Sequence, residues 1–339
     1  MTQIQHNQLV SFIWNIANDV LVNVYNKGDY RKVILPMIVL RRFDAVLEDT
    51  KKEVLAMKER LTAANIIQQD EALCAVAGQA FCNSSPFTLK DLKSRTNSQQ
   101  LKLDFIAYLD GFSANVQDII TKFKFRNEID TLVEGGVLGL LIEKFVDNRI
   151  NLSNRPVLFD DGSVRLPALD NHSIGTVFEE LLRRFNEENN VTEAGEHFTP
   201  RDIVTLMAEI AFVPIMDKIT DSSYLIYDGA CGTGGILSVS EERLQQLAEA
   251  CGKRINTHIF GQELQPETYA TCKSDLLIKG DGEEANNISF GSTISEDGKA
   301  GMKFDFCISN PPFGTPWKRD LENWGLKDKK DITDGRFLI

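Results

Sequence analysis

The sequence has little of what metal centres, disulfide scaffolds and membrane spans require. Its 339 residues include six cysteines and four histidines, and no two cysteines form a C-x-x-C pair. No cysteine lies near a histidine at the spacing of metal ligands, so we expect no metal and reduced thiols, as in a cytoplasmic protein. No apolar run reaches the ~18 residues of a membrane span, and the N-terminus lacks a basic segment followed by an apolar one. Neither a signal peptide nor a membrane partner is therefore expected.

The chain also has fewer basic residues than acidic ones. The chain has 37 Lys and Arg against 49 Asp and Glu, a net charge of −12. A protein that coats nucleic acid neutralises phosphates with clustered basic residues, so the overall charge argues against that class. It leaves open a basic face on an acidic molecule, or a partner subunit that supplies the positive charge. The 42% hydrophobic and 25% charged content is that of a soluble globular protein of one large domain or two ordinary ones.

The first half of the chain has the apolar periodicity of helices. Apolar residues recur at steps of three and four in the segments 9–25, 33–61, 101–123 and 129–148. This half is interpreted as a helical bundle that supports another domain, or as a helical clamp on DNA or on a partner. In the second case the phosphate contacts would come from Arg31, Lys32, Arg41 and Arg42. A connector rich in Pro, Gly and Asp at 154–171 suggests a domain boundary, so we expect a helical domain at 1–155.

From about residue 223 the pattern changes to strands that alternate with helices. Strands are predicted at 224–228, 257–264, 286–293 and 304–309, and helices between them at 236–251 and 266–280. Such alternation is typical of a doubly wound, mostly parallel sheet. The expected fold class is therefore α/β, with an N-terminal helical bundle followed by a Rossmann-like domain at 156–339. A further helix is expected after Thr199, which would cap it.

A glycine-rich loop follows the first predicted strand. Asp228 ends that strand, and Gly232, Gly234 and Gly235 then lie at the sheet edge where such folds bind ligands. The loop lacks the third glycine of G-x-G-x-x-G and the G-K-[ST] of a phosphate loop. Glu263 ends the next strand, where a carboxylate can accept hydrogen bonds from both hydroxyls of a ribose. The pattern predicts a cofactor whose identity stays open, and a tight turn without a ligand is the alternative.

The stretch NPPF (310–313) follows the last predicted strand. Pro311 and Pro312 fix φ and lack N–H donors, and Pro311 holds Asn310 extended. The result is a rigid rim of acceptors beside the flat face of Phe313. This rim suits a planar heterocycle with an exocyclic amine, which would donate to the Asn310 oxygen and the Pro311 carbonyl and stack on Phe313. A plain turn after a strand is the alternative.

Taken together, these residues resemble the S-adenosylmethionine-dependent amino-methyltransferases of DNA. More closely, the chain is similar to the modification subunit of type I restriction–modification systems. The matching motifs are DGACGTGG (228–235), GQEL (261–264), NPPF (310–313), GEHFTPRDIV (195–204), YRKVILPMIVLRRFDAVLE (30–48) and IGTVFEELLRRF (174–185). They cover nearly the whole chain, and the combination is more specific than NPPF alone, which guanine-N2 methyltransferases of RNA share. The resemblance implies a methyltransferase catalytic domain at 156–339.

The resemblance implies a role for each matched residue. The cofactor would be S-adenosyl-L-methionine, with Asp228 near its amino group and Glu263 on its ribose. The other residues implied to line it are Glu196, His197, Phe198, Thr199, Pro200, Arg201, Gly232, Thr233, Gly234 and Gly235. The substrate would be an adenine in DNA, methylated at N6. This base would have to be flipped out of the duplex, because its amine is otherwise paired inside the helix. The catalytic set implied to hold this base is Asn310, Pro311, Pro312 and Phe313.

The implied partners are double-stranded DNA and the specificity and restriction subunits of a type I complex. Two departures from the family pattern bear on this. Family members often carry an acidic residue after the third strand, where this chain has Ser292. They also continue beyond the DGRFLI at which this chain stops, so the catalytic domain is expected to be incomplete. A module that binds cofactor without turnover, or an amino-methyltransferase of RNA or protein, are the alternatives.

Overall fold

The computed structural model describes residues 2–189, 199–280, 282–314, 316 and 318–333. It divides into two compact units by its contacts: Met1–Ala194 with Lys273–Ala285, and Gly195–Cys272 with Asn286–Ile339. The connector after residue 155 therefore packs with the first unit, and a division into functional domains at that residue stays a prediction. No helix within the described ranges combines the length and apolar character needed to cross a bilayer.

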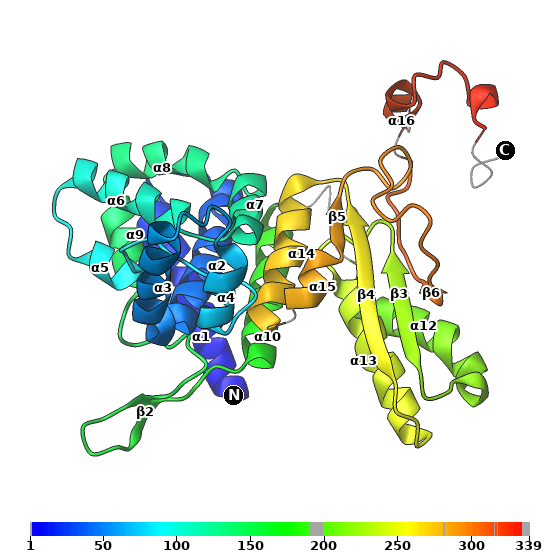
Figure 1. Cartoon of the computed structure of the whole chain (residues 1–339), viewed down its shortest axis with the longest axis horizontal. Coiled ribbons are helices and arrows are strands. Elements are labelled where there is room, and N and C mark those ends of the chain that lie inside the picture. The colour runs from blue at the N-terminus through cyan, green and yellow to red at the C-terminus, as the bar shows by residue number, and fades with distance from the viewer. Residues whose placement is uncertain (1, 190–198, 281, 315, 317, 334–339) are drawn as a thin grey trace. The chain divides into compact units, whose positions relative to one another are not determined.

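The first unit consists mainly of helices, as the periodicity predicts (Figure 1). Three of the predicted segments are each divided into two helices, because glycine or a short 3-10 turn interrupts them. Gly136, for example, has a φ of 69° and ends the helix before it. The α-helices of this unit are α1 Gln3–Leu21, α2 Arg31–Leu47, α3 Lys51–Ala63, α4 Asp70–Ala77, α5 Leu89–Lys93, α6 Ser98–Asp110, α7 Ala114–Lys122, α8 Phe125–Glu134, α9 Leu138–Phe145 and α10 Asn171–Asn189. The unit also includes the second half of α14 and most of α15, which are introduced below.

Helix α2 forms the centre of this unit. Every residue from Val33 to Ala45 is buried, including Arg41 and Arg42. The hypothesis that these two arginines contact phosphate is therefore wrong. Arg41 donates from Nε to the Phe145 carbonyl at 3.1 Å. Both side chains satisfy the backbone of neighbouring segments instead of facing solvent.

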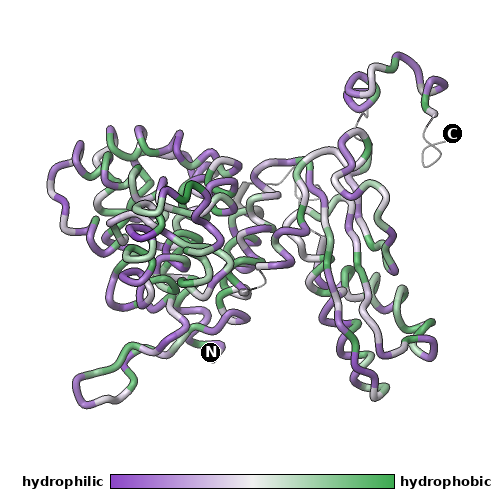
Figure 2. The backbone as a smooth tube through the Cα atoms, in the orientation of Figure 1, coloured by the Kyte–Doolittle hydropathy of each residue, from purple (hydrophilic) through white to green (hydrophobic). Residues whose placement is uncertain are grey.

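The connector forms a small antiparallel hairpin. Its strands are β1 Val157–Leu158 and β2 Val164–Leu166. Leu158, Phe159 and Val164 are each more than half exposed, and Figure 2 shows hydrophobic segments along the hairpin. Arg42 fastens both ends of the connector, since its Nη1 donates to the carbonyls of Leu152 at 2.7 Å and Leu169 at 2.9 Å.

The second unit contains the predicted parallel sheet. Its strands are β3 Ser223–Asp228, β4 Asn256–Glu263, β5 Ile288–Phe290 and β6 Phe306–Cys307, in the spatial order β5-β4-β3-β6. All three pairings are parallel, which confirms the expected sheet. The paired parts of β5 and β6 are shorter than predicted. The helices are α12 Arg201–Phe212, α13 Gly235–Ala250, α14 Pro266–Lys279, α15 Gly282–Asn286 and α16 Lys318–Asn323.

Helices α12 and α13 pack against each other, and α13 packs on β3 and β4 (Figure 1). Ile226 of β3 lies beside Ile259 of β4 in register, and both are buried. Phe212 of α12 meets Phe306 of β6 edge to face, with ring centroids 4.9 Å apart. The strand order reverses at β3: β4 and then β5 are added on one side of it, and β6 pairs with its other side. Ligands of doubly wound folds bind beyond the carboxyl ends of the strands at such a switch point.

Helix α14 belongs to both units. Its residues up to Cys272 are part of the second unit, and those from Lys273 are part of the first. Lys279 at its end lies 2.5 Å from Asp275 and 3.1 Å from Glu179 of α10. The paired carboxylates raise the pKa of Lys279 well above its usual value, against the opposing effect of burial.

Candidate functional site

The loop after β3 bends at two glycines. Gly232 and Gly234 have φ values of 57° and 88°. A Cβ on Gly234 would lie 2.8 Å from Cys272 Sγ, so both the backbone conformation and the available space require glycine there. The Cys231 N–H donates to the Gln262 carbonyl at 3.0 Å. This bond ties the loop to the end of β4.

Asp228 ends β3 and is fully buried at the base of this loop. Its Oδ1 accepts from the Ala230 N–H at 3.0 Å and from the Ser309 hydroxyl at 2.6 Å. Its Oδ2 is buried and has no hydrogen-bond partner among the described residues. Burial, and secondarily the nearby Glu263 carboxylate, raise the pKa of Asp228 to about 6, while its hydrogen bonds oppose the shift. An unsatisfied buried carboxylate oxygen is costly, so it points to a positively charged ligand group.

Glu263 ends β4 with its carboxylate held against the same loop. Its Oε2 accepts from the Gly232 N–H at 2.9 Å, and its Oε1 accepts from the Gln265 N–H at 2.7 Å. These two bonds orient the carboxylate, and an ionised carboxylate offers about four acceptor sites, a type of group that can also bind ribose hydroxyls. The Gly291 N–H donates to the Glu263 carbonyl at 3.0 Å. The tips of β3, β4 and β5 are thus joined into one rim.

Asn310 follows β6 on this rim, one residue after the serine that bonds Asp228. Its side chain is exposed, and its Nδ2 donates to the Thr199 hydroxyl at 3.0 Å. Pro311 and Pro312 are exposed, and Phe313 is 87% exposed. A phenyl ring that is exposed to this extent is costly to hold in water and offers a face to a planar ligand.

The structure therefore brings together several residues that the sequence only predicts as a site. Glu263 accepts from the Gly232 N–H, and Asp228 accepts from Ser309, the residue before Asn310. Asn310 in turn bonds to Thr199, from a segment 111 residues away. Thr233 is part-buried, and Gly235 is the first residue of α13. Glu196, His197 and Phe198 lie outside the described residues.

The segment before α12 differs in detail from the prediction. The N-cap of α12 is Pro200, without a side-chain capping bond, so the prediction that Thr199 caps the helix is wrong. Its hydroxyl accepts from Asn310 instead. Arg201 opens the helix, and its Nη2 lies 3.3 Å from the exposed Glu242. Its assignment to the cofactor stays a prediction.

Two residues of the rim are not among the site residues predicted from the sequence. Ser309 donates to Asp228, and its position directly before Asn310 could have suggested a place on the rim. Asp320 of α16 accepts from the Ser292 hydroxyl at 2.6 Å. Nothing in the sequence pairs these two, because 28 residues separate them.

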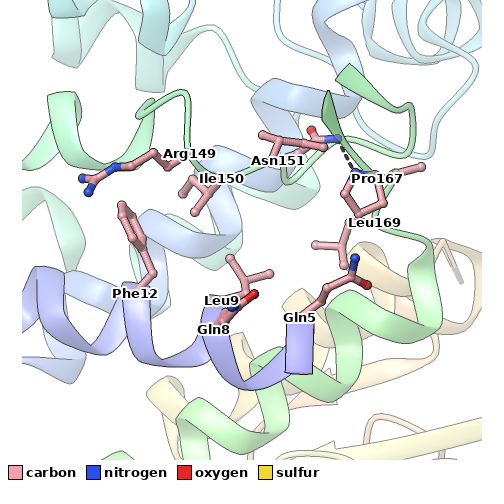
Figure 3. A pocket seen from close by; sticks show the side chains of 11 residues that line it. Gln5, Gln8, Leu9, Phe12, Arg149, Ile150, Asn151, Pro167 and Leu169 are labelled. Carbon is pink, nitrogen blue, oxygen red and sulfur yellow. Dashed lines mark hydrogen bonds between the residues drawn. The ribbon is translucent and has the colours of Figure 1, made fainter. Parts of the chain in front are cut away.

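A cavity of about 270 Å³ lies elsewhere, in the first unit. Figure 3 shows that Phe12 of α1, Arg149 and Asn151 line it, and that Asn151 Nδ2 donates to the Pro167 carbonyl, at 2.9 Å. The Arg149 guanidinium lies 5.1 Å from the centroid of the Phe12 ring. None of the predicted site residues contributes to this cavity. No cluster of three or more His, Cys, Asp or Glu suited to a metal occurs within the described part of the chain.

Comparisons with known proteins agree with this arrangement. The N-6 DNA Methylase family matches residues 169–337, and the HsdM N-terminal domain family matches residues 9–145. The two matches leave residues 146–168, most of the connector included, between them. Among solved structures, the type I restriction–modification system methyltransferase subunit from Streptococcus thermophilus superposes with a TM-score of 0.60 at 20% identity, over 92% of this chain and 64% of that one. That likeness supports the fold.

Curated relatives are similar along most of the chain. The MjaIX methylase subunit of a type I restriction enzyme, from Methanocaldococcus jannaschii, is 22% identical over 89% of this chain and 50% of its own length. The MpnII methylase subunit from Mycoplasma pneumoniae is 23% identical over 98% of this chain and 62% of its own length. The chain thus spans between half and two thirds of these relatives. With both of its halves matched in order, the chain belongs to the family of methylase subunits of type I restriction–modification systems.

Proposed function

We propose that this protein transfers a methyl group from S-adenosyl-L-methionine to N6 of adenine in DNA, as the modification subunit of a type I restriction–modification complex. The observation that carries the proposal is the shared rim. Ser309 bonds to the buried Asp228 carboxylate, and Asn310 is the next residue, so the carboxylate and the amide both lie at the carboxyl ends of the strands. A ligand charge held at Asp228 and a base held at Asn310 would therefore lie next to one another, which is the arrangement that a direct transfer needs.

The cofactor fits the donors and acceptors of the rim. Oδ2 of Asp228 has no hydrogen-bond partner within the described ranges and would accept from the ammonium of the methionine part. The Glu263 carboxylate, oriented by two backbone N–H groups, would accept from the ribose hydroxyls. The glycine loop lets the backbone approach closely between them. When bound, S-adenosyl-L-methionine supplies a methyl group on a positively charged sulfur.

The base would be held by Asn310 and the residues after it. Since Asn310 donates through Nδ2 to Thr199, its Oδ1 is left to accept from the exocyclic amine of adenine. The Pro311 carbonyl would accept the second amine proton, and the exposed Phe313 ring would stack on the base. These acceptors draw the N–H bonds out of the ring plane and localise the lone pair on N6. The amine would then attack the methyl carbon in line, so that the N–C bond forms as the S–C bond breaks. S-adenosylhomocysteine would leave as the neutral thioether, and the methylated amine would lose one proton to solvent, with positioning as the main catalytic effect.

The proposed partners follow from the chemistry and from the family. An adenine N6 inside a duplex is paired, so the base must be flipped out of double-stranded DNA to reach the rim. The formal charge of −12 suits a subunit that relies on a separate specificity subunit for most phosphate and base contacts. A restriction subunit would complete the complex, which would work in the cytoplasm where DNA is found.

The proposal is tested by incubating the full-length protein and its specificity subunit with labelled S-adenosyl-L-methionine and duplex DNA. Label is expected in N6-methyladenine. Label that appears only in RNA guanine or on protein would show that the substrate class is wrong. Cofactor binding without transfer to any of these would favour a binding module instead.

The raised pKa of Asp228 predicts how cofactor affinity depends on pH. Binding an ammonium needs the carboxylate ionised, and at pH 5 only about a tenth of a group with a pKa of about 6 is ionised. Affinity for S-adenosylhomocysteine, which has the same ammonium, is therefore expected to fall about tenfold from pH 7 to pH 5. Calorimetry at several pH values measures this, and Asp228→Asn should flatten the profile while the exposed Asp217→Asn leaves it unchanged.

The same group gives a second readout in the ligand-free protein. A carboxyl whose folded-state pKa is raised binds protons more tightly in the folded than in the unfolded chain between pH ~4 and ~6. Its contribution therefore lowers the free energy of unfolding as pH rises through that window. Asp228→Asn should remove this loss and unfold at a higher temperature than wild type at pH 7. A variant that is no more stable at pH 7 would contradict the cause assigned to the shift.

A further inference from the structure

The hairpin of the connector presents apolar side chains to solvent. Leu158 and Val164 are opposite each other in the pairing of β1 with β2, so their side chains lie on one face of the hairpin. They are 51% and 58% exposed, and Phe159 at the turn is 53% exposed. A two-stranded hairpin is by itself at best marginally stable in water, and exposed apolar groups of this size are costly. These features indicate a surface that a partner covers.

The cavity of the first unit lies at the other end of this hairpin. Leu166, the last residue of β2, lines it together with Leu9, Phe12 and Ile150 (Figure 3). Its volume of about 270 Å³ is close to that of small ligand sites, so it can admit a bulky apolar side chain. Phe159 is such a side chain, but it lies at the turn, away from the cavity of its own chain.

The charges of the two ends of the hairpin are opposite. The turn carries Asp160 and Asp161, and both are exposed. The cavity end carries Arg149, whose guanidinium lies over the Phe12 ring and whose side chain is 65% exposed. Asp147 accepts from Nε and Nη2 of this arginine, and Nη1 has no hydrogen-bond partner among the residues that the structure describes. An acidic, apolar turn and an apolar cavity with a basic group at its edge are complementary to each other.

We propose that this hairpin forms the interface of a symmetric dimer of the chain, in which two hairpins lie antiparallel and the turn of each reaches the cavity of the other. A two-fold axis between the hairpins forms both contacts at once, because whatever one copy contributes its partner contributes as well. From Gly162 to Leu166 the strand rises roughly 13 Å, which is the overlap that the two hairpins need. Phe159 then fills the partner's cavity, and Asp160 pairs with the partner's Arg149. This inference does not depend on the proposed function.

Sedimentation velocity of the full chain at increasing concentration tests the dimer. The mean mass should rise from that of one 38.0 kDa chain toward twice that value. Half of the chains should be dimeric at about 1–100 µM, as expected for a small interface of the transient kind. Phe159→Ser should weaken association at least about tenfold, because it removes the side chain that fills the cavity. Ile67→Ser changes a 94% exposed isoleucine elsewhere in the same unit and should associate like the wild type.

A charge exchange tests the reciprocal contact. Arg149→Glu and Asp160→Arg each place like charges opposite each other at both contacts of the dimer, so neither variant alone should associate where the wild type does. An equimolar mixture of the two variants should associate again, because their heterodimer has opposite charges at both contacts. Restored association would also show that both variants are folded.

Three results would contradict the proposal. A chain that stays monomeric up to about 200 µM, well above the expected range, would mean that another molecule covers the hairpin. A dimer that Phe159→Ser leaves unchanged would use another surface. If the wild type associates and the mixed variants do not, the pairing of Arg149 with Asp160 is wrong, and the antiparallel arrangement with it.

Discussion

Asn310→Ala is expected to slow methyl transfer to DNA by at least about a hundredfold while cofactor affinity changes little. The side chain accepts from the adenine amine only at the reacting centre, and removal of one such positioned group typically costs 10²–10³ in rate. Stability should be nearly unchanged, because Asn310 is exposed and, among the residues that the structure describes, its side chain bonds to Thr199 alone. Single-turnover transfer of labelled methyl by the complex with the specificity subunit measures the rate, and calorimetry with S-adenosylhomocysteine measures affinity.

The matched control for this experiment lies at the opposite end of the sheet. Asn256 is exposed at the start of β4, so Asn256→Ala should transfer at the wild-type rate. A loss of cofactor affinity in Asn310→Ala comparable to its loss of rate would show that this residue serves the cofactor rather than the base. An unchanged rate would remove Asn310 from the catalytic set.

Arg42→Met is expected to lower the free energy of unfolding by about 3 kcal/mol, the effect of breaking a buried, hydrogen-bonded charge network. Arg42 is 1% exposed, and its Nη2 also donates to Asn171 Oδ1, at 2.8 Å. Methionine fills part of the volume but leaves the carbonyls of Leu152 and Leu169 without their donor. Burial lowers the pKa of Arg42 to about 10, so the side chain stays charged at neutral pH and its loss should act throughout that range.

Urea unfolding, followed by hydrogen exchange of α2, α10 and the connector, measures this effect. Exchange should increase first at the connector, whose two ends Arg42 holds. Arg60→Met, on the exposed face of α3, is the control and should change stability by less than about 0.5 kcal/mol. A similarly small change for Arg42→Met would mean that the three acceptors find other donors.

The sheet and its glycine loop could be predicted because their signals are local. An apolar strand that ends in Asp228, followed by closely spaced glycines, has few structural solutions. The same holds for Asn310 before two prolines. The helical half was also clear, although the helix ends at Gly111 and Gly136 were not, since a glycine within an apolar pattern does not say whether the chain turns there.

The contacts that complete the site could not be predicted in this way. Ser309 meets Asp228 only because the sheet order places β6 beside β3. Ser292 meets Asp320 only because the chain returns from α16 to the end of β5. For Arg41 and Arg42 the sequence suggested a contact that the structure does not contain. Their charge suggested a surface role, but burial is decided by how α2 packs among its neighbours, and a charge count contains no information on that.

The shared helix α14 determines whether either unit can be produced as a separate fragment. The contact boundary passes through it between Cys272 and Lys273, and the chain enters the first unit a second time before returning to the second unit at Asn286. Neither unit is a continuous stretch of sequence. A single proteolytic cut or stop codon therefore cannot release either one intact. If the gene is divided near codon 155 or 194, we expect the two fragments to fold only when they are expressed together. The units are therefore best studied by co-expression of complementary fragments rather than as isolated pieces.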